Sequence, residues 1–195
     1  MKFKDRVNDI VKSTSVLYRR GIREGLMWID IKENLSRKSG RKLRRDRDCV
    51  WDPPPMSWLK FNVAGVVVEE VEGYGGMLRD KKGVVSALFS SKCGACGVEQ
   101  AVVMAIKVAT EIFIDWMWKV NVSLIVEFEL CNISDWLKYR RLRPWSVRKL
   151  FANIEGGLRH LVEIKFVVTN IQKNGMANSL ANAGLSRSHF FKAYW

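Results

Sequence analysis

The chain has 195 residues, 48% of them hydrophobic and 27% charged, which allows one packed domain with an appendage and excludes disorder along the whole length. Its 33 Lys and Arg against 20 Asp and Glu leave a net charge of +13, so we expect a polyanionic partner, nucleic acid first and an anionic membrane surface second. It has no apolar run long enough for a membrane span, a charged N-terminus instead of a secretory signal, and four scattered cysteines, so we expect an intracellular protein with reduced thiols.

Residues 1–50 are predicted to form a basic helical segment followed by a linker. They contain 15 Lys and Arg against seven Asp and Glu, and apolar residues recur at helical spacing in the first part. Residues 32–49 are almost free of large apolar side chains, so they cannot bury enough surface to offset the entropy of ordering them. Three consecutive prolines at 53–55 cannot enter a helix. We therefore expect a domain boundary here and a globular domain over 51–195.

Three antiparallel strands are predicted at the start of this domain. Apolar side chains alternate with others over 59–64, a glycine-rich string leads into a second strand, and a polar turn leads into a third over 84–89. Short connections of this kind favour an antiparallel meander. Because Gly73, Gly75 and Gly76 precede a strand and not a helix, we interpret them as points of close backbone packing and not as a phosphate-binding loop.

Helices and strands alternate in the rest of the domain. The expected elements are a helix over 98–116, a strand over 122–126, helices over 132–139 and 146–158, a strand over 162–168 and a helix over 174–183. Pro144 separates the two middle helices, and Gly184 is a typical residue to end the last one. The order predicts an α/β fold with a five-stranded mixed sheet, three antiparallel strands followed by alternating helices and strands, flanked by helices.

Four strings, in this order along the chain, resemble those of ribonuclease H type 1 domains. They are WDPPPMSWLKFNVAG, GYGGMLRDKKGVV, LIVEFELCNISDWL and NGMANSLANAG, and they are most similar to the plant reverse-transcriptase-like subfamily derived from non-LTR retrotransposons. The resemblance covers residues 51–195 and leaves residues 1–50 uncovered. It implies the ribonuclease H-like fold and, for the family, a Mg²⁺-dependent ribonuclease activity on RNA–DNA hybrids.

The resemblance also implies four carboxylates that hold two Mg²⁺ ions, one to activate water and one to stabilise the leaving oxygen. In this chain the first-strand acid of the family falls on Ala64, and the acid of the first long helix falls on Val102. The fourth-strand acid falls on Glu129 and the last-helix acid on Asn178, so Glu129 is the one family acid that is kept. A single carboxylate offers little to a cation that dehydrates reluctantly, so we expect no metal or other cofactor and no hydrolysis.

An alternative is an RNA–DNA hybrid ribonuclease in which other side chains replace the missing acids. Glu99 lies one helical turn before Val102, and Glu127 shares a strand face with Glu129. Asn178 offers a neutral oxygen. Phosphoryl transfer tolerates little misplacement of its ligands, so we rank this alternative second.

Two groups of basic residues are candidates for nucleic-acid contacts. The first lies in the linker and consists of Arg37, Lys38, Arg41, Lys42, Arg44, Arg45 and Arg47. The second lies where ribonuclease H domains commonly carry a basic protrusion and consists of Lys138, Arg140, Arg141 and Arg143, followed by Arg148 and Lys149. Such dense positive charge neutralises phosphates and releases their counterions. The first group also fits a nuclear-import signal or a segment that only aids solubility.

The tryptophans could offer faces on which bases stack, but most have a plainer explanation. Trp116, Trp136 and Trp145 stand in apolar or helical patterns and are expected in the core. Trp51 and Trp58 flank the prolines and are expected to pin the linker to the domain.

We therefore expect a nucleic-acid-binding ribonuclease H-like domain that holds an RNA–DNA hybrid or a duplex by backbone contacts and has lost hydrolysis. A membrane partner is not expected. The location is expected to be intracellular, and nuclear if the linker carries an import signal. A decayed gene product without a selected role is equally compatible with the loss of polar site residues to Ala and Val.

Overall fold

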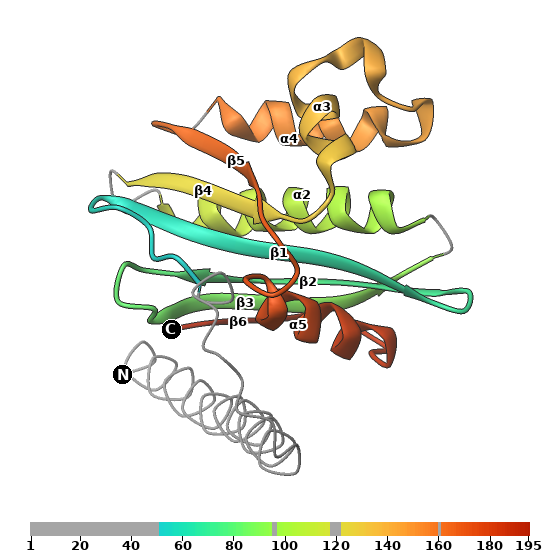
Figure 1. The fold of residues 1–195 in the computed structure, drawn as a ribbon, viewed down its shortest axis with the longest axis horizontal. Coiled ribbons are helices and arrows are strands. Elements are labelled where there is room, and N and C mark those ends of the chain that lie inside the picture. Colours follow the sequence, from blue (N-terminus) through green and yellow to red (C-terminus); the bar gives the residue numbers. More distant parts are fainter. Residues whose placement is uncertain (1–50, 95–96, 118–121, 160) are drawn as a thin grey trace, which may run out of the picture. The chain divides into compact units, whose positions relative to one another are not determined.

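The computed structural model describes residues 51–94, 97–117, 122–159 and 161–195. The predicted N-terminal helices, the linker and the first basic group therefore lie outside the described residues. In chain order the elements are β1 (Trp58–Val68), β2 (Val71–Arg79), β3 (Val85–Cys93), α2 (Val98–Met117), β4 (Ser123–Phe128), α3 (Cys131–Lys138), the short 3₁₀ helices η2 (Arg140–Leu142) and η3 (Trp145–Val147), α4 (Arg148–Leu158), β5 (Ile164–Val168), α5 (Gly175–Leu185) and β6 (Phe191–Tyr194) (Figure 1).

The strands form one mixed sheet in the order β5-β4-β1-β2-β3-β6. As predicted, β1, β2 and β3 pair antiparallel, whereas β4 runs parallel to β1 and β5 parallel to β4. The predicted α/β class with a mixed sheet and flanking helices is confirmed. The predicted number of strands is corrected from five to six, because β6 pairs antiparallel with β3. With four residues, β6 is too short for alternation to distinguish it from an irregular C-terminal segment.

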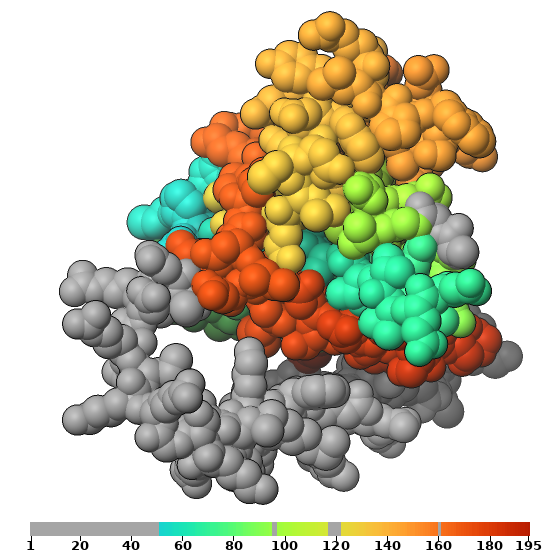
Figure 2. All heavy atoms as spheres, turned by 45° about the vertical axis from the view of Figure 1, so that its right-hand side comes forward, coloured from blue at the N-terminus to red at the C-terminus, as the bar shows by residue number. Residues whose placement is uncertain are grey.

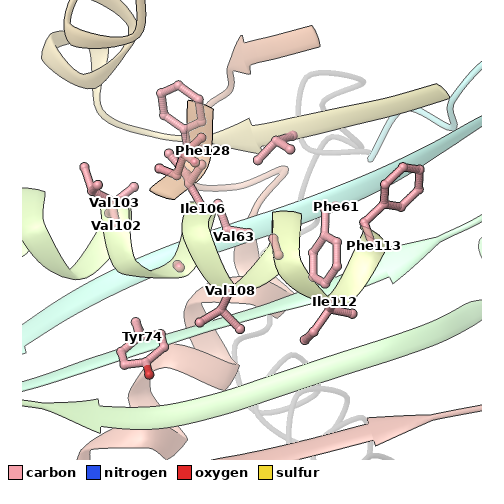
Figure 3. Packing of buried hydrophobic residues seen from close by; sticks show 14 of the residues in the cluster. Phe61, Val63, Tyr74, Val102, Val103, Ile106, Val108, Ile112, Phe113 and Phe128 are labelled. Carbon is pink, nitrogen blue, oxygen red and sulfur yellow. The ribbon is translucent and has the colours of Figure 1, made fainter. Parts of the chain in front are cut away.

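The main hydrophobic core lies between the sheet and α2. Phe61 and Val63 of β1 are fully buried there, and Figure 3 shows them beside Ile106 and Phe113 of α2. The apolar stripe of α2, which repeats every three to four residues, therefore faces the sheet. Although α2 is 20 residues long, no helix in the described part of the chain is long and apolar enough to cross a membrane.

The other face of β1 is polar and lies against α5. Lys60, Asn62 and Ala64 alternate with the core residues of β1, so they point to this second face. Ala64 is 3% exposed and packs in a small cluster with Ala177 and Ala181 of α5. The sheet therefore separates a mainly apolar core from a face that carries more polar side chains.

The close approach of α5 to the sheet depends on two of the glycines in β2. A Cβ atom on Gly75 would lie 2.7 Å from the backbone carbonyl carbon of Leu180, and one on Gly73 would collide with the carbonyl oxygen of Ala181. Backbone atoms cannot move aside as a flexible side chain can, so only glycine fits. The interpretation of these glycines as points of close backbone packing is confirmed.

Candidate functional site

Three of the four family-acid positions meet beside the middle of β1. Glu129 follows the end of β4, and Asn178 lies near the start of α5. The Nδ2 group of Asn178 donates a hydrogen bond to Oε1 of Glu129 at 2.5 Å. Ala64 packs against Ala177, the residue that precedes Asn178. Two strands and one helix that are distant in sequence thus converge on one point.

Val102 reaches the same part of β1 from the opposite face. A Cβ atom on Gly65, the neighbour of Ala64, would lie 2.7 Å from the backbone nitrogen of Val102. The Val102 side chain is 3% exposed and belongs to the main hydrophobic core. Ala64 and Val102, onto which the resemblance places the first two family acids, are therefore buried apolar groups with ordinary packing roles.

Asn174 completes this site, and the sequence analysis did not single it out. Its side chain is 1% exposed, and its Nδ2 group donates to the carbonyl oxygen of Val63 at 2.9 Å and to Oε1 of Glu129 at 3.1 Å. Its Oδ1 atom accepts a hydrogen bond from Asn62 at 3.1 Å. Asn174 is the first residue of the string NGMANSLANAG, so the resemblance contained a signal for it. Two amide groups, from Asn174 and Asn178, therefore donate to the one retained carboxylate.

Glu127 and Glu99, the two acids considered as replacements, are both engaged elsewhere. Glu127 lies on the expected face of β4 and is 7% exposed, but its Oε1 atom pairs with Nζ of Lys60 at 2.5 Å and its Oε2 atom accepts from Asn62 at 2.9 Å. Glu99 accepts a hydrogen bond from Asn132 of α3 at 3.4 Å. Both oxygens of Glu127 are thus used in a buried ion pair and its supporting hydrogen bond.

This buried pair extends into a network that holds the segment before β1. Oδ1 of Asn62 accepts hydrogen bonds from Nη2 of Arg79 at 2.7 Å and from the indole nitrogen of Trp51 at 3.0 Å. The Arg79 guanidinium also lies over the Trp51 ring, 3.8 Å from its centroid. Burial lowers the pKa of Arg79 to about 10, against the opposing effect of the Glu127 charge. Trp51 is therefore pinned to the sheet, as predicted.

The residues at this site do not fit a pair of divalent cations. Mg²⁺ requires oxygen ligands directed at a common centre, whereas Ala64 and Val102 present only methyl groups. Asn174 and Asn178 direct N–H groups at Glu129, and rotating either amide would place its oxygen against the carboxylate. Across the described ranges, no group of three or more His, Cys, Asp or Glu side chains could hold a metal ion.

The second basic group lies on the surface between α3 and α4. Its side chains are exposed at Lys138, Arg140, Arg141, Arg148 and Lys149. Figure 2 shows this part of the chain, in golden orange, on the outer surface at the top of the view. A hollow of about 390 Å³ is lined by Arg140, Arg141, Arg143, Arg148, Ala152 and Glu155. Four guanidinium groups against one carboxylate make this hollow strongly positive.

Arg143, which was predicted to contact nucleic acid, has a structural role. It is 8% exposed, and its Nε and Nη2 groups donate to the carbonyl oxygens of Trp136 at 2.6 Å and Leu137 at 3.3 Å. Its Nη1 atom pairs with Oε1 of Glu155 at 2.7 Å. Although burial raises the pKa of Glu155, hydrogen bonds from Arg143 and Arg140 outweigh it and hold this pKa below its usual value. The arginine thus ties the end of α3 to α4.

The other tryptophans follow the predictions only in part. Trp116 and Trp136 are partly buried against the main core, as expected. Trp58 lies within β1 with Nζ of Lys165 4.3 Å from its ring centroid, and its predicted contact with the linker lies outside the described residues. Trp145 was predicted in the core, and this is wrong, because its side chain is 84% exposed. The sequence around Trp145 has the pattern of a helix start. That pattern does not reveal whether a side chain in a short 3₁₀ turn faces the core or the solvent.

No protein family model matches the chain, and no curated protein matches it either. Solved structures do match. Ribonuclease H1 from the archaeon Halobacterium salinarum is similar at 16% identity and a TM-score of 0.58, over 66% of this chain and 97% of that one. The N-terminal ribonuclease H domain of a Mycobacterium tuberculosis protein is similar at 14% identity and a TM-score of 0.60, over 66% and 99%.

A third match is LC11 ribonuclease H1, isolated from compost by a metagenomic approach and solved in complex with an RNA/DNA hybrid. It is 21% identical with a TM-score of 0.60, over 65% of this chain and 96% of that one. These structural neighbours are ribonuclease H domains, and at such low identity they establish the fold alone. The described domain has the ribonuclease H fold.

Proposed function

We propose that this protein binds nucleic acid, an RNA–DNA hybrid or a duplex, through the phosphate backbone and does not hydrolyse it. The observation that carries the proposal is the state of Glu129. Its carboxylate is held by the amides of Asn174 and Asn178, with Ala64 beside them, while an exposed arginine-rich surface remains between α3 and α4. The carboxylate at the expected hydrolytic centre thus has amide donors as partners, and an exposed basic surface remains available for phosphates.

The charge of the molecule supports binding. Phosphate contacts from Lys and Arg supply most of the affinity of sequence-independent nucleic-acid binding, since they release condensed counterions. The chain has a net charge of +13, and Lys138, Arg140, Arg141, Arg148 and Lys149 of the second basic group are exposed, although Arg140 also pairs with Glu155 at 2.8 Å. LC11 ribonuclease H1, which shares this fold, is solved with an RNA/DNA hybrid, the ligand class that we assign to this chain.

The same residues support the loss of hydrolysis. Two-metal cleavage needs cations held on both sides of the scissile phosphate. Three of four carboxylates are replaced, and the fourth accepts hydrogen bonds from two amide N–H groups, which occupy one of its oxygens. Phosphoryl transfer depends on accurate positioning of these ligands, so one remaining acid is not enough.

The origin and location that we propose rest on the sequence strings and on the linker. The four strings favour the plant reverse-transcriptase-like subfamily of non-LTR retrotransposon origin, with a degenerate active site. We place the protein inside the cell, and the basic residues at 37–47 are the candidate for a nuclear-import signal. They are also the candidate for a second set of phosphate contacts.

Equilibrium binding by the full chain tests the proposal. We expect it to bind a labelled RNA–DNA hybrid and a DNA duplex, with affinity that falls steeply between about 50 mM and about 200 mM salt. Binding that is absent, or independent of salt, would overturn the proposal. The same samples, incubated with Mg²⁺ or Mn²⁺, are expected to show no cleavage of the hybrid.

A charge-reversal pair identifies the binding surface. Replacing Lys138 and Lys149 by Glu is expected to weaken hybrid binding by about tenfold or more, since it removes two cations that neutralise phosphates and adds two repulsive charges. The matched control replaces Lys81 and Lys82, exposed lysines in the turn between β2 and β3, by Glu as well. It makes the same change in charge and is expected to weaken binding less. Equal losses of affinity in the two variants would mean that only the total charge matters and would refute the assigned surface.

Metal-dependent cleavage would support the second candidate, an active hybrid ribonuclease. In that case Glu129→Gln would abolish cleavage, because it removes the last family carboxylate. A trace activity that survives Glu129→Gln would instead be a contaminant. The binding and cleavage assays therefore separate the two functions with one variant.

A further inference from the structure

Trp145 is held in solvent by a loop that is itself fixed. The indole is 84% exposed, yet two residues that flank it are buried, Arg143 at 8% and Val147 at 2% exposure. The guanidinium of Arg143 lies 4.3 Å from the centroid of the Phe151 ring and is tied to Glu155 and to the end of α3. The loop therefore has two inward anchors with the largest side chain turned outward between them.

The exposed Trp145 side chain contributes little to the stability of the folded domain. Burying an aromatic ring of this size would remove a large apolar area from water, and tryptophans are well buried on average. The neighbouring Tyr139 and Leu142 are also exposed, at 52% and 47%. Large exposed apolar groups gathered in one short segment mark an interaction site more often than a single one does.

The charge around Trp145 indicates the kind of partner. The hollow of about 390 Å³ beside this loop is lined by four arginines and one carboxylate. Arg141 and Arg148, on either side of Trp145 in the sequence, are exposed. Protein interfaces are enriched in aromatic residues and Arg but depleted of Lys, and this surface also exposes Lys138 and Lys149. Aromatic faces among basic side chains are typical of surfaces that bind single-stranded nucleic acid. Charge complementarity therefore favours a polyanion with flat apolar faces.

We propose that the segment 139–148 binds unpaired nucleotides, with a base stacked on Trp145 and the flanking phosphates held by Arg141 and Arg148. This inference rests on the proposed nucleic-acid binding and adds the preferred strand state. Bases inside a duplex are stacked on one another and cannot offer a face to the indole, so Trp145 contacts only unpaired nucleotides, in single strands or single-stranded tails, while the basic residues around it also contact the phosphates of a hybrid. Every base has a π-face, so the contact does not select a sequence.

Two substitutions of Trp145 in the full chain test the inference. Trp145→Leu keeps an apolar side chain and removes the aromatic face, whereas Trp145→Phe keeps an aromatic face. The probes are a labelled oligothymidylate and a blunt RNA–DNA hybrid. We expect Trp145→Leu to weaken oligothymidylate binding at least about fivefold and to leave hybrid binding within about twofold, and Trp145→Phe to retain most of the affinity for both.

The outcomes separate this inference from the function on which it rests. If neither probe binds the native chain, the proposed function fails. If both bind with the expected salt dependence but Trp145→Leu binds oligothymidylate as the native chain does, the stacking site is refuted and the proposed function stands. An equal loss of affinity for both probes also refutes it. Because Trp145 is exposed, its variants should have the same thermal unfolding midpoint as the native chain. A large shift in that midpoint would show that the role of Trp145 is structural.

Discussion

At the scale of single residues, the centre of the site is a carboxylate surrounded by hydrogen-bond donors. Glu129 accepts from Asn174 and Asn178, and the neighbouring Glu127 is paired with Lys60. In both cases a negative charge that could attract a cation is satisfied by groups of the protein itself. A buried charge with hydrogen-bonding partners is stable, whereas the same charge without them is costly.

Asn178→Asp tests whether Glu129 depends on its amide donors. The change removes a hydrogen bond and places a second carboxylate beside the first, so the free energy of unfolding near neutral pH should fall by roughly 1–3 kcal/mol. Because protonation of either carboxyl group relieves the repulsion, the difference from the native chain should shrink toward about pH 4. Urea unfolding at two pH values measures both effects. If Asn178→Asp is as stable as the native chain near neutral pH, the hydrogen bond from Asn178 to Glu129 is contradicted.

Lys60→Met tests the buried ion pair. It leaves Glu127 buried without its charged partner, so we expect a loss of about 3–5 kcal/mol in the free energy of unfolding. The double variant Lys60→Met, Glu127→Leu removes both charges and should recover much of that loss. If the double variant is no more stable than Lys60→Met, the loss in the single variant does not come from an unpaired buried charge on Glu127.

At the scale of elements, the site exists because α5 lies very close to β1 and β2. The glycines of β2 allow the backbones to approach, which brings Asn174 and Asn178 over the end of β4. On the other side of the molecule, Arg143 and Glu155 join α3 to α4 and shape the basic surface. Both arrangements depend on contacts between segments that are far apart in the sequence.

Gly75→Ala is expected to push α5 away from the sheet. The added Cβ atom would lie 2.7 Å from the backbone carbonyl carbon of Leu180, and overpacking of this kind costs about 1–3 kcal/mol. Gly156→Ala is the matched control, because a Cβ atom there meets nothing within 4 Å and lies within α4. It should stabilise the domain by about 0.4–1 kcal/mol. Thermal unfolding of the two variants should therefore shift in opposite directions.

Glu155→Gln tests the connection between α3 and α4 through its pH dependence. The pKa of Glu155 lies below its usual value in the folded domain because its hydrogen bonds to Arg143 and Arg140 outweigh burial. Its contribution is therefore present above the pKa of the unfolded chain and is lost as the pH falls through the lower folded value. Glu155→Gln should unfold more easily than the native chain near neutral pH and about equally well at low pH. A difference independent of pH would contradict this.

At the scale of the whole molecule, the positive charge is concentrated at one end of the sequence. Residues 1–50 hold 15 Lys and Arg against seven Asp and Glu, so eight of the net charge of +13 belong to them. We expect the charge in this segment to act on a polyanion through long-range attraction and counterion release. The domain from residue 51 onward adds the arginine-rich surface, whose geometry is defined.

Removing residues 1–50 should weaken binding to a duplex and reduce its salt dependence. The slope of the logarithm of affinity against the logarithm of salt concentration becomes shallower by about 0.9 for each phosphate that the protein no longer neutralises. Binding isotherms at several salt concentrations measure this slope for the full chain and the shortened one. An unchanged slope would show that the first 50 residues bind no phosphates.

Several structural features were predictable because they depend on local patterns. Alternation in β1, helical spacing in α2 and the short turns indicated the α/β fold, and the four strings assigned Ala64, Glu129 and Asn178 to positions that do lie together. The missed strand, β6, has too few residues for a pattern. Trp145 was misplaced because periodicity describes a regular helix and not a 3₁₀ turn.

The sequence by itself determined where positive charge is concentrated, since charge is a property of residue identity, and its resemblance to a family predicted which carboxylates are replaced. Only the tertiary structure decided how the remaining groups are used: Glu127 in an ion pair, Asn174 as a donor to Glu129, Arg143 turned inward and Trp145 outward. The physical reason is that a polar or aromatic side chain is committed by neighbours from other elements, and burial and hydrogen bonding depend on contacts that no local pattern contains.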